Sequence, residues 1–331
     1  LNNSKKVAIL DEKGIYCYSS ILSLFLDNKI FVPLNEKFSD EKNINIIKSA
    51  KVDTILAGEK YKYKAKSLKN SVKNIKTIII DEKIFKDNQI KEISLEKSKL
   101  KDIAYIFFTS GSTGNPKGVP ISNENLSHYL INLEKRYSFN SKDRFSNNFD
   151  ITFDLFLHDF LLSWINGGTL FVPDKFYFFN PTRFIRRHRI TCWFSVPSLG
   201  LNMLNSKQLK SRKLHTLKYS AFCGEALPEL LVNKWQFAAP KSKIDNLYGP
   251  TETTLAISGY RWVKKKSSQE CLNGIVPIGK LFKNNNYLKY KKKKFELILR
   301  GKQVFEGYLN SRIINKKKLI KIKNLKYFKT G

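Results

Sequence analysis

The sequence is poor in cysteine and contains no long apolar run. Its four cysteines lie far apart without a Cys-x-x-Cys pair, so we expect neither a metal cluster nor a disulfide framework, and a reducing compartment fits this usage. No segment approaches the roughly 18 uninterrupted apolar residues of a membrane-spanning helix. The most apolar stretch, 153–173, is interrupted by Asp154, His158, Asp159 and Asn166. No secretory signal is recognised, and we therefore expect a cytoplasmic protein without a membrane span.

Acidic residues are also few. Asp and Glu number 28 against 60 Lys and Arg, which gives a formal net charge of +32. Such a charge marks either a protein that binds nucleic acid or an anionic membrane, or compositional drift in a sequence rich in Lys, Asn and Ile. The lysines are spread over the whole chain, and no basic segment is interleaved with aromatics as in nucleic-acid modules. We favour drift and expect no nucleic-acid partner.

The order of apolar and amphipathic segments predicts the fold. The chain has 331 residues and is 42% hydrophobic, enough for about two lobes. Strand-like runs alternate with helix-length segments, which is typical of an α/β fold with doubly wound, mostly parallel sheets covered by helices. From about Leu255 the pattern changes to short strands with Gly and Asn turns. We therefore expect α/β lobes over residues 1–254 and a smaller, barrel-like β-rich lobe over 255–331, with 62–101 as a variable surface excursion.

A segment rich in glycine and hydroxyl groups follows a predicted buried strand. Residues 109–118 read Thr-Ser-Gly-Ser-Thr-Gly-Asn-Pro-Lys-Gly, directly after the apolar run 105–108 and before a helix predicted to start near Ser122. Glycines allow the backbone to approach phosphate oxygens, and consecutive N–H groups form an anion-binding concavity. Lys117 adds a mobile positive charge, but Gly118 follows it, so the segment is not a Walker A loop. We interpret it as a phosphate-binding loop rather than a linker, because linkers seldom follow a buried strand directly.

Two motifs resemble those of the adenylate-forming superfamily, which includes acyl-CoA synthetases, luciferases and peptide-synthetase adenylation domains. The segment 109–118 resembles the family's signature loop, and 246–254 (Asn-Leu-Tyr-Gly-Pro-Thr-Glu-Thr-Thr) resembles its second diagnostic motif. Weaker similarities at 31–34, 221–228 and 301–308 extend the resemblance over nearly the whole chain. It implies an AMP-forming ligase that uses ATP to activate a carboxylic acid as an acyl-AMP, with release of pyrophosphate.

The resemblance also implies a role for each matched residue. Tyr248 would stack on the adenine ring, and Glu252 would bind the Mg²⁺ that accompanies ATP. The expected catalytic residues are Thr109, Lys117 and Glu252. The expected ATP- and phosphate-binding residues are Thr109, Ser110, Gly111, Ser112, Thr113, Gly114, Lys117, Gly224, Glu225, Asn246, Tyr248, Gly249 and Thr251. The substrate carboxylate would attack the α-phosphorus directly, helped by prepositioned donors and a cation, so no protein nucleophile is required.

The sequence around Asp150 indicates the class of acid. Residues 148–154 (Asn-Phe-Asp-Ile-Thr-Phe-Asp) resemble the family's acyl-pocket motif, in which amino-acid-activating members carry an Asp that pairs with the substrate ammonium. A buried carboxylate is costly unless it is paired, which favours a cationic partner for Asp150. The alternative is that Asp150 caps the following helix and Asp154 lies on the exposed face of that helix.

The rest of the acid pocket is inferred from the same resemblance. The expected acid-binding residues are Asp150, Ile151, Asp154, Ala221, Cys223, Leu247, Leu255 and Ala256. Asp154 departs from the family pattern, and it either faces away or admits a polar or basic side chain. The segments 167–170 and 222–228 most resemble D-alanine–D-alanyl carrier protein ligases, with stand-alone peptide-synthetase adenylation domains close behind. This favours a small amino acid that is transferred to the phosphopantetheine thiol of a carrier protein.

The resemblance predicts that the chain belongs to a longer protein. Its first residue is not Met, and its end, 327–331, resembles the Tyr-x-x-Thr-Gly motif one residue before the Asp that grips the ribose. The family's lid and lid lysine would follow, so we expect the fragment alone to be inactive. Two other functions stay open: an acyl-CoA synthetase for an acid without an amine, which Asp150 disfavours, and a catalytically inactive basic binding protein. The positive charge would suit an acidic carrier protein and an anionic nucleotide.

Overall fold

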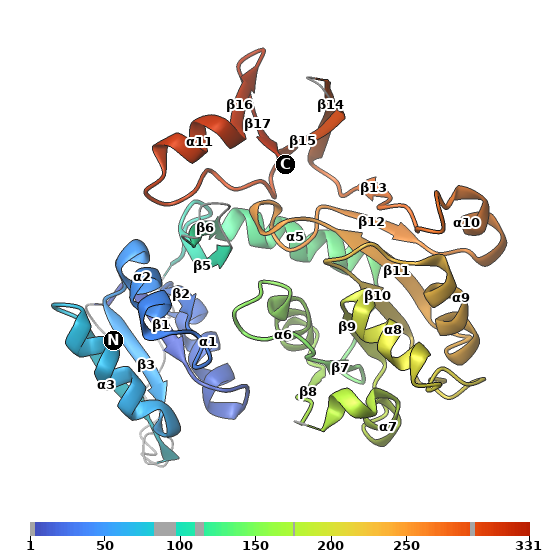
Figure 1. The fold of residues 1–331 in the computed structure, drawn as a ribbon, viewed down its shortest axis with the longest axis horizontal. Coiled ribbons are helices and arrows are strands. Elements are labelled where there is room, and N and C mark those ends of the chain that lie inside the picture. Colours follow the sequence, from blue (N-terminus) through green and yellow to red (C-terminus); the bar gives the residue numbers. More distant parts are fainter. Residues whose placement is uncertain (1–3, 83–96, 110–115, 175, 292–294) are drawn as a thin grey trace.

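Three β-sheets carry the fold of the computed structural model, which describes residues 4–82, 97–109, 116–174, 176–291 and 295–331. Figure 1 shows them around a common centre, the first (blue to cyan) at the left, the second (green to orange) at the right and the third (red) at the top. Two sheets are mostly parallel, and the third is antiparallel. The α/β fold class predicted from the sequence is confirmed. Within the described ranges, none of the helices combines the length and the apolar character that a membrane crossing requires.

The first sheet has six strands in the order β4-β3-β1-β2-β5-β6. Neighbouring strands are parallel except β5 and β6. Val7 and Ile9 of β1 pack in one core cluster with α1, whereas Ala8 and Leu10 pack in another with α2 and α3, so helices cover both faces. The elements are β1 (Lys6–Leu10), α1 (Ile15–Leu26), β2 (Ile30–Pro33), α2 (Asp40–Ala50), β3 (Thr54–Gly58), η1 (Glu59–Tyr61), α3 (Lys62–Ser71), β4 (Lys76–Ile80), β5 (Ile103–Thr109) and β6 (Lys117–Ser122).

Two details of this sheet differ from the sequence-based expectations. The stretch 62–101 is not only a surface excursion, because it supplies α3 and the edge strand β4. The second detail is β6, a strand that was not predicted and that pairs antiparallel with β5 after the glycine-rich segment. The helix predicted to start near Ser122 is confirmed, since α5 begins at Asn123 with Ser122 as its N-cap.

The second sheet has seven strands in the order β13-β12-β11-β10-β9-β7-β8. Strands β7 to β11 run parallel to one another, whereas β12 pairs antiparallel with both β11 and β13. The side chains of Ser122 and Asn125 form a capping box that starts α5. The elements are α5 (Asn123–Arg136), β7 (Arg144–Ser146), α6 (Phe156–Ile165), β8 (Thr169–Phe171), η2 (Tyr177–Phe179), α7 (Pro181–Arg187), β9 (Cys192–Ser195), α8 (Pro197–Asn205), β10 (Tyr219–Phe222), α9 (Glu229–Ala238), β11 (Lys243–Tyr248), η3 (Thr251–Thr253), β12 (Ser258–Arg261), α10 (Lys264–Glu270) and β13 (Lys280–Leu281).

The third sheet is small and antiparallel, with the order β14-β15-β17-β16. Its elements are β14 (Asn285–Lys291), β15 (Phe295–Gly301), α11 (Arg312–Lys318), β16 (Leu319–Ile322) and β17 (Leu325–Lys329). The change in pattern noted at Leu255 therefore precedes this sheet, because β12 and β13 still pair with the second sheet. The division at 254 and 255 stays a proposal.

One core cluster joins all three sheets. It contains Phe107 of β5, Phe194 of β9 and Phe328 of β17, together with helix residues such as Phe156 and Phe160. Each of these five side chains is at most 2% exposed. Since the cluster is continuous, the three sheets hold the segments between them in fixed relative positions.

Candidate functional site

The predicted phosphate loop lies between β5 and β6. Its central residues Ser110, Gly111, Ser112, Thr113 and Gly114 lie outside the described residues. The two flanking residues are described: Thr109 at the end of β5 and Lys117 at the start of β6 are register partners. The segment therefore joins two paired antiparallel strands, which fixes both of its ends.

A tyrosine connects two of the three predicted catalytic residues, Lys117 and Glu252. The ammonium of Lys117 lies 5.9 Å from the centroid of the Tyr308 ring. The hydroxyl of Tyr308 donates a hydrogen bond of 2.6 Å to Oε1 of Glu252, and the backbone N–H of Phe305 donates to the carbonyl of Glu252 at 2.9 Å. Burial raises the pKa of Tyr308 above its ordinary value, and the adjacent Glu252 carboxylate adds to the effect. Tyr308 therefore stays a neutral donor.

Glu252 has the chemistry of a ligand for a hard cation. Its side chain is buried, and Oε1 is held by Tyr308, while Oε2 has no hydrogen-bond partner among the described residues. The described side chains contain no group of three His, Cys, Asp or Glu that could hold a metal by itself. A Mg²⁺ ion at Glu252 fits this arrangement only if most of its ligands come from elsewhere, as when Mg²⁺ is bound through one carboxylate and substrate phosphates.

The predicted adenine-binding residues line one cavity. Its volume is about 480 Å³, and it lies where β10 and β11 end. Both amide hydrogens of Asn246 are used, because Nδ2 donates to the carbonyls of Val276 and Pro277, each at 3.1 Å. Its Oδ1 has no such partner in the described part of the chain. The predicted residues that line the cavity are Gly224, Glu225, Asn246, Leu247, Tyr248 and Gly249, and Thr330 joins them.

Glu225 contributes to this cavity in a different way from the one the motif implied. Its carboxylate accepts hydrogen bonds from the backbone N–H of Ser198 at 2.8 Å and from the Ser198 hydroxyl at 3.0 Å. The side chain therefore caps the first turn of α8. Gly224 has a φ of 94°, a backbone conformation that other residues rarely adopt, and this turns the chain out of β10.

Thr251 lies in a turn with an unusual backbone. Thr254 and Leu255 have φ values of 60° and 61°, a conformation that costs about 1–3 kcal/mol per residue and persists only where surrounding contacts enforce it. The Thr254 hydroxyl donates to the carbonyl of Gln303 at 2.7 Å. Gly249 packs so closely that a Cβ there would lie 2.7 Å from the Cα of Ala256. These contacts fix the turn, and with it Thr251 and Glu252.

Asp150 presents one free carboxylate oxygen. Its Oδ1 accepts hydrogen bonds from Nδ2 of Asn35 at 3.2 Å, from the Thr152 backbone at 2.9 Å and from the Thr152 hydroxyl at 2.6 Å. Its Oδ2 has no hydrogen-bond partner within the described ranges. The side chain lines a cavity of about 640 Å³ together with Lys13 and Ile151. Asp150 is not a helix cap, because α6 starts at Phe156 after Leu155 and has no side-chain cap.

Asp154 points inward. Its side chain is buried, and Oδ2 has no hydrogen-bond partner among the described residues. Burial raises the pKa of Asp154 from 3.8 to about 6, although the hydrogen bond from Thr251 opposes this shift. Burial also raises the pKa of the Cys223 thiol to about 12, with a contribution from the Asp154 carboxylate. The alternative in which Asp154 lies on the exposed face of the following helix is therefore wrong.

The apolar residues predicted for the acid pocket are all buried in the core, and their role as a pocket stays a prediction. Each is at most 4% exposed, and all belong to the core cluster that joins the three sheets. These residues are Ile151, Ala221, Cys223, Leu247, Leu255 and Ala256. Ile151 lines the cavity of Asp150 and Leu247 lines the cavity around Tyr248, whereas the other four line neither of these cavities.

Sequence reasoning missed two residues of this site. Tyr308 lies in a segment, 301–308, that the resemblance marked without assigning it a role. Lys13 carried no signal in the sequence. Its ammonium donates to the carbonyls of Asn147 at 2.6 Å and Phe149 at 3.1 Å, and so fixes the backbone that leads to Asp150. Burial lowers the pKa of Lys13 from 10.5 to about 8, an effect that the Asp150 charge opposes.

Similar proteins are known. A family model described as AMP-binding enzyme matches residues 1–309. The chain is 31% identical over 240 residues to the D-alanine–D-alanyl carrier protein ligase of Bacillus cereus (strain AH187), a match that covers 69% of this chain and 47% of the relative. A ligase with the same description from Bacillus cytotoxicus is 30% identical over the same shares. The chain thus spans about half the length of the curated relatives it matches.

Solved structures share the fold. The crystal structure of IdnL7 has a TM-score of 0.91 and 26% identity, covering 99% of this chain and 69% of that one. The Vibrio cholerae adenylation domain AlmE, in complex with glycyl-adenosine-5'-phosphate, has a TM-score of 0.88 and 27% identity, covering 100% of this chain and 68% of that one. Because the family model extends over most of its residues, this chain belongs to the AMP-binding enzyme family, a part of the adenylate-forming superfamily.

Proposed function

We propose that the full-length protein uses ATP to activate a small amino acid as an aminoacyl-AMP, which is then transferred to the phosphopantetheine thiol of a carrier protein. The observation that supports the substrate class best is the free Oδ2 of Asp150 at a cavity wall, with Oδ1 held by Asn35 and Thr152. A carboxylate held in this way is prepared to pair with a substrate ammonium. The relatives named above, a D-alanyl carrier protein ligase and a glycyl-adenylate complex, agree with this proposal.

The nucleotide would occupy the cavity at the ends of β10 and β11. The adenine ring would stack on Tyr248, which is half-buried there. The free Oδ1 of Asn246 would accept from the adenine amino group, since Nδ2 is already used. Thr109, the backbone N–H of Thr251 and the segment 110–114 would donate hydrogen bonds to the phosphates, since the Thr251 hydroxyl already binds Asp154.

Charge determines the chemical step. The substrate carboxylate attacks the α-phosphorus, and pyrophosphate leaves, so negative oxygens crowd together in the transition state. Lys117 and backbone N–H groups would offset this charge. Mg²⁺, when bound at Oε2 of Glu252, would supply further neutralisation of the phosphates. Tyr308 fixes the orientation of Glu252 and leaves Oε2 available.

Pyrophosphate exchange tests the proposal. We would measure ATP–pyrophosphate exchange by the full-length protein with a panel of amino acids and matched acids that lack the α-amine. The proposal predicts exchange with a small amino acid and little with its des-amino counterpart. Preference for an acid without the amine would indicate an acyl-CoA synthetase, and no exchange with any acid would indicate a binding protein. Either result would refute the proposed function.

A further inference from the structure

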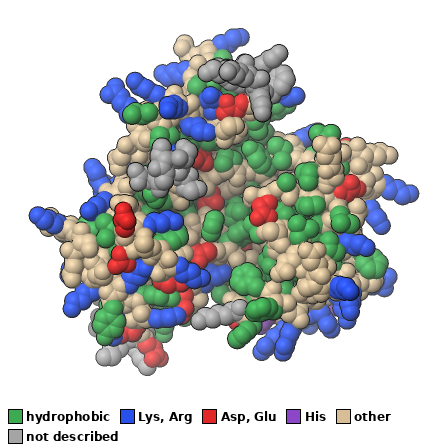
Figure 2. All heavy atoms as spheres, in the orientation of Figure 1, with side chains coloured by type: hydrophobic (Ala, Val, Ile, Leu, Met, Phe, Trp, Pro, Cys, Tyr) green, Lys and Arg blue, Asp and Glu red, His purple; other side chains and the backbone are tan. Residues whose placement is uncertain are grey.

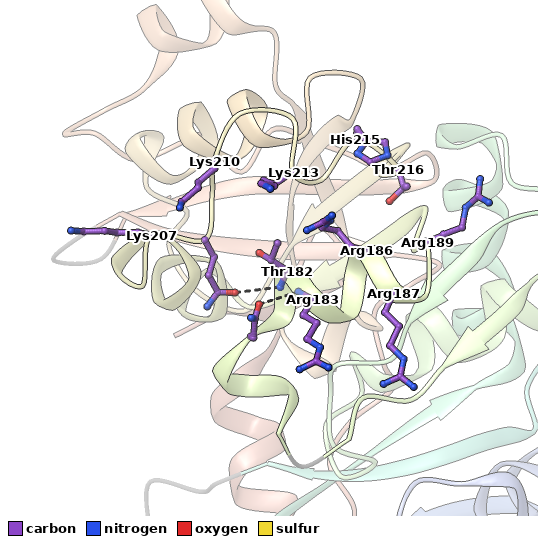
Figure 3. Close-up of a pocket in the computed structure, with 12 residues that line it drawn as sticks. Thr182, Arg183, Arg186, Arg187, Arg189, Lys207, Lys210, Lys213, His215 and Thr216 are labelled. Carbon is purple, nitrogen blue, oxygen red and sulfur yellow. Dashed lines mark hydrogen bonds between the residues drawn. The ribbon is translucent and has the colours of Figure 1, made fainter.

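A second, strongly basic cavity lies between α7 and the segment 207–216. Its volume is about 870 Å³, and it is lined by four arginines between residues 183 and 189 and by three lysines between 207 and 213. No acidic side chain lines it among the described residues. Figure 3 shows Arg186 extending from α7 into the space beside the segment that carries Lys210 and Lys213. Figure 2 shows Lys and Arg side chains gathered at the lower right, around the position of α7 in Figure 1.

This cavity is separate from the adenylation site. Helix α7 leads into β9, and the segment 207–216 leads into β10, so both walls lie at the amino ends of these parallel strands. The cavity around Tyr248 lies at the opposite edge, where β10 and β11 end. A molecule bound between the basic walls would therefore not take part in the adenylation chemistry.

The composition of the cavity is not explained by general enrichment in lysine. Only ten of the 60 basic residues in the sequence are arginines, and four of the ten lie within residues 183–189. Other arginines have structural partners: Arg136 and Arg261 bind the buried Asp245, and Arg144 donates to the carbonyl of His188. A drift towards lysine would not gather arginines at one place.

The cations of the cavity are exposed and lack counter-ions. All seven side chains are exposed, and none of them forms an ion pair with another described residue. A simpler interpretation is that α7 exposes a polar face to solvent, because Arg183, Arg186 and Arg187 alternate with the buried Phe184 and Ile185. That reading does not account for the lysines on the facing segment. Seven like charges around one cavity repel one another, and a bound anion would relieve this repulsion.

Hydrogen bonds connect the two walls of the basic cavity. The backbone N–H of Thr182 donates to Oε1 of Gln208 at 3.3 Å, and Nε2 of Gln208 donates to the carbonyl of Phe179 at 3.1 Å. The Thr216 hydroxyl donates to the carbonyl of Ile190 at 2.8 Å. One polar group remains unused: the hydroxyl of Thr182, in a side chain only 8% exposed, has no hydrogen-bond partner within the described ranges. An unpaired buried hydroxyl on a residue that lines a cavity of clustered cations is a candidate donor to a bound anion.

We propose that this cavity binds a compact, multiply phosphorylated anion. Guanidinium groups match phosphate geometry with paired hydrogen bonds, and lysines add point charges. The two-sided shape favours an anion that enters between Arg186 and Lys213 over a flat membrane, which would meet only the rim. Apart from His215, the lining has no aromatic ring on which the bases of a nucleic acid could stack.

Calorimetric titration with inorganic tripolyphosphate tests the proposal. We would use the full-length protein at about 0.15 M salt, where exposed charges are screened beyond about 8 Å, with the nucleotide site saturated by AMP. The wild-type protein is expected to bind one tripolyphosphate. The triple variant Arg186→Gln, Lys210→Gln, Lys213→Gln should bind it at least about tenfold more weakly, since several charge-assisted hydrogen bonds are lost. Its affinity for ATP should not change.

A control variant with the same change in net charge distinguishes a specific anion site from attraction by the overall positive charge of the protein. Lys264→Gln, Lys265→Gln and Lys266→Gln remove the same charge from exposed positions on α10 and should leave tripolyphosphate affinity unchanged. Thr182→Val, which keeps the net charge, should weaken binding severalfold. Equal loss in both triple variants, or no binding by the wild-type protein, would overturn the proposal. So would binding of single-stranded oligouridine or phosphatidylglycerol vesicles that is as tight as that of tripolyphosphate at equal phosphate concentration.

Discussion

Tyr308 and Glu252 lie 56 positions apart in the sequence, and the Tyr308 hydroxyl is 2.6 Å from Oε1 of Glu252. The contact makes the orientation of Glu252 depend on the segment that joins β15 of the third sheet to α11. It also places the Tyr308 ring below the ammonium of Lys117. The proposed metal ligand and the proposed phosphate-binding lysine therefore share one support.

Substitutions at Glu252, Tyr308 and Lys117 should each weaken adenylation, but to different extents. In the full-length protein, Glu252→Ala should lower pyrophosphate exchange by about 10²–10³, because it removes the metal ligand from a charged centre. Tyr308→Phe should lower it by about tenfold, the effect of one hydrogen bond to a charged group. Lys117→Ala should have a smaller effect than Glu252→Ala. Tyr287→Phe, at an exposed position in β14, is the matched control, and wild-type rates in all variants would contradict the assignment of Glu252 and Lys117.

Asp150→Ala should discriminate between acids. With an amino acid the change should cost about 2–4 kcal/mol in kcat/KM, because the ammonium is left without its partner. With the des-amino acid it should have little effect. Asp174→Ala, which removes a carboxylate from the same cavity, should alter neither rate. Equal losses of kcat/KM for both acids after Asp150→Ala would show that Asp150 does not bind the substrate amine.

A larger side chain at Cys223 should change the choice of acid. Cys223 is fully buried beside Asp154, so Cys223→Met inserts volume into a packed region and should destabilise the protein by about 1–3 kcal/mol. Pyrophosphate exchange should then shift towards glycine and away from larger amino acids. Cys192→Met, at another buried position, should lower the melting temperature similarly without this shift. An unchanged preference among amino acids in Cys223→Met would show that Cys223 does not shape the acid pocket.

The buried Asp154 should make stability depend on pH in an unusual direction. Its pKa is raised to about 6 in the folded state from 3.8, so the folded protein retains a proton that the unfolded chain has lost. Wild-type stability should therefore fall as the pH rises from about 4 to 6. Asp154→Asn should remove this loss and be more stable at pH 7.5 by about 3 kcal/mol.

Denaturant unfolding at pH 4.5 and 7.5 checks this expectation. The gain from Asp154→Asn should be larger at pH 7.5 than at pH 4.5. Asp11, whose pKa burial also raises to about 6, is unchanged in both proteins, so its contribution cancels in the comparison. A gain in stability that is the same at both pH values would show that folding does not raise the pKa of Asp154.

Local pattern was sufficient to predict the fold class and most of the elements. The alternation of apolar strands and amphipathic helices predicted mostly parallel sheets covered by helices, and the motif around Tyr248 identified a segment that does line a cavity. The family resemblance predicted that Asn246, Tyr248 and Gly224 lie together. In the structure they do, because they lie at the carboxyl ends of neighbouring parallel strands, which meet at one edge of the sheet.

The remaining features depend on contacts between distant segments. Phe153 is 64% exposed whereas Asp154 is 7% exposed. Polarity alone would predict the opposite, with Phe153 buried and Asp154 exposed. The role of Tyr308 follows from its contact with Glu252, which neither motif contains. Lys13 binds two carbonyls more than 130 positions away, and a solvated lysine would look the same in the sequence.

The core cluster shared by the three sheets has a consequence for how the protein unfolds. Phe305 and Phe328 pack in the same cluster as Phe107 and Phe194, so the last 80 or so residues help to bury apolar surface of the first two sheets. We expect one cooperative unfolding transition, in which circular dichroism and tryptophan fluorescence coincide. A chain cut after residue 254 should therefore expose part of this surface and aggregate instead of folding as an independent unit.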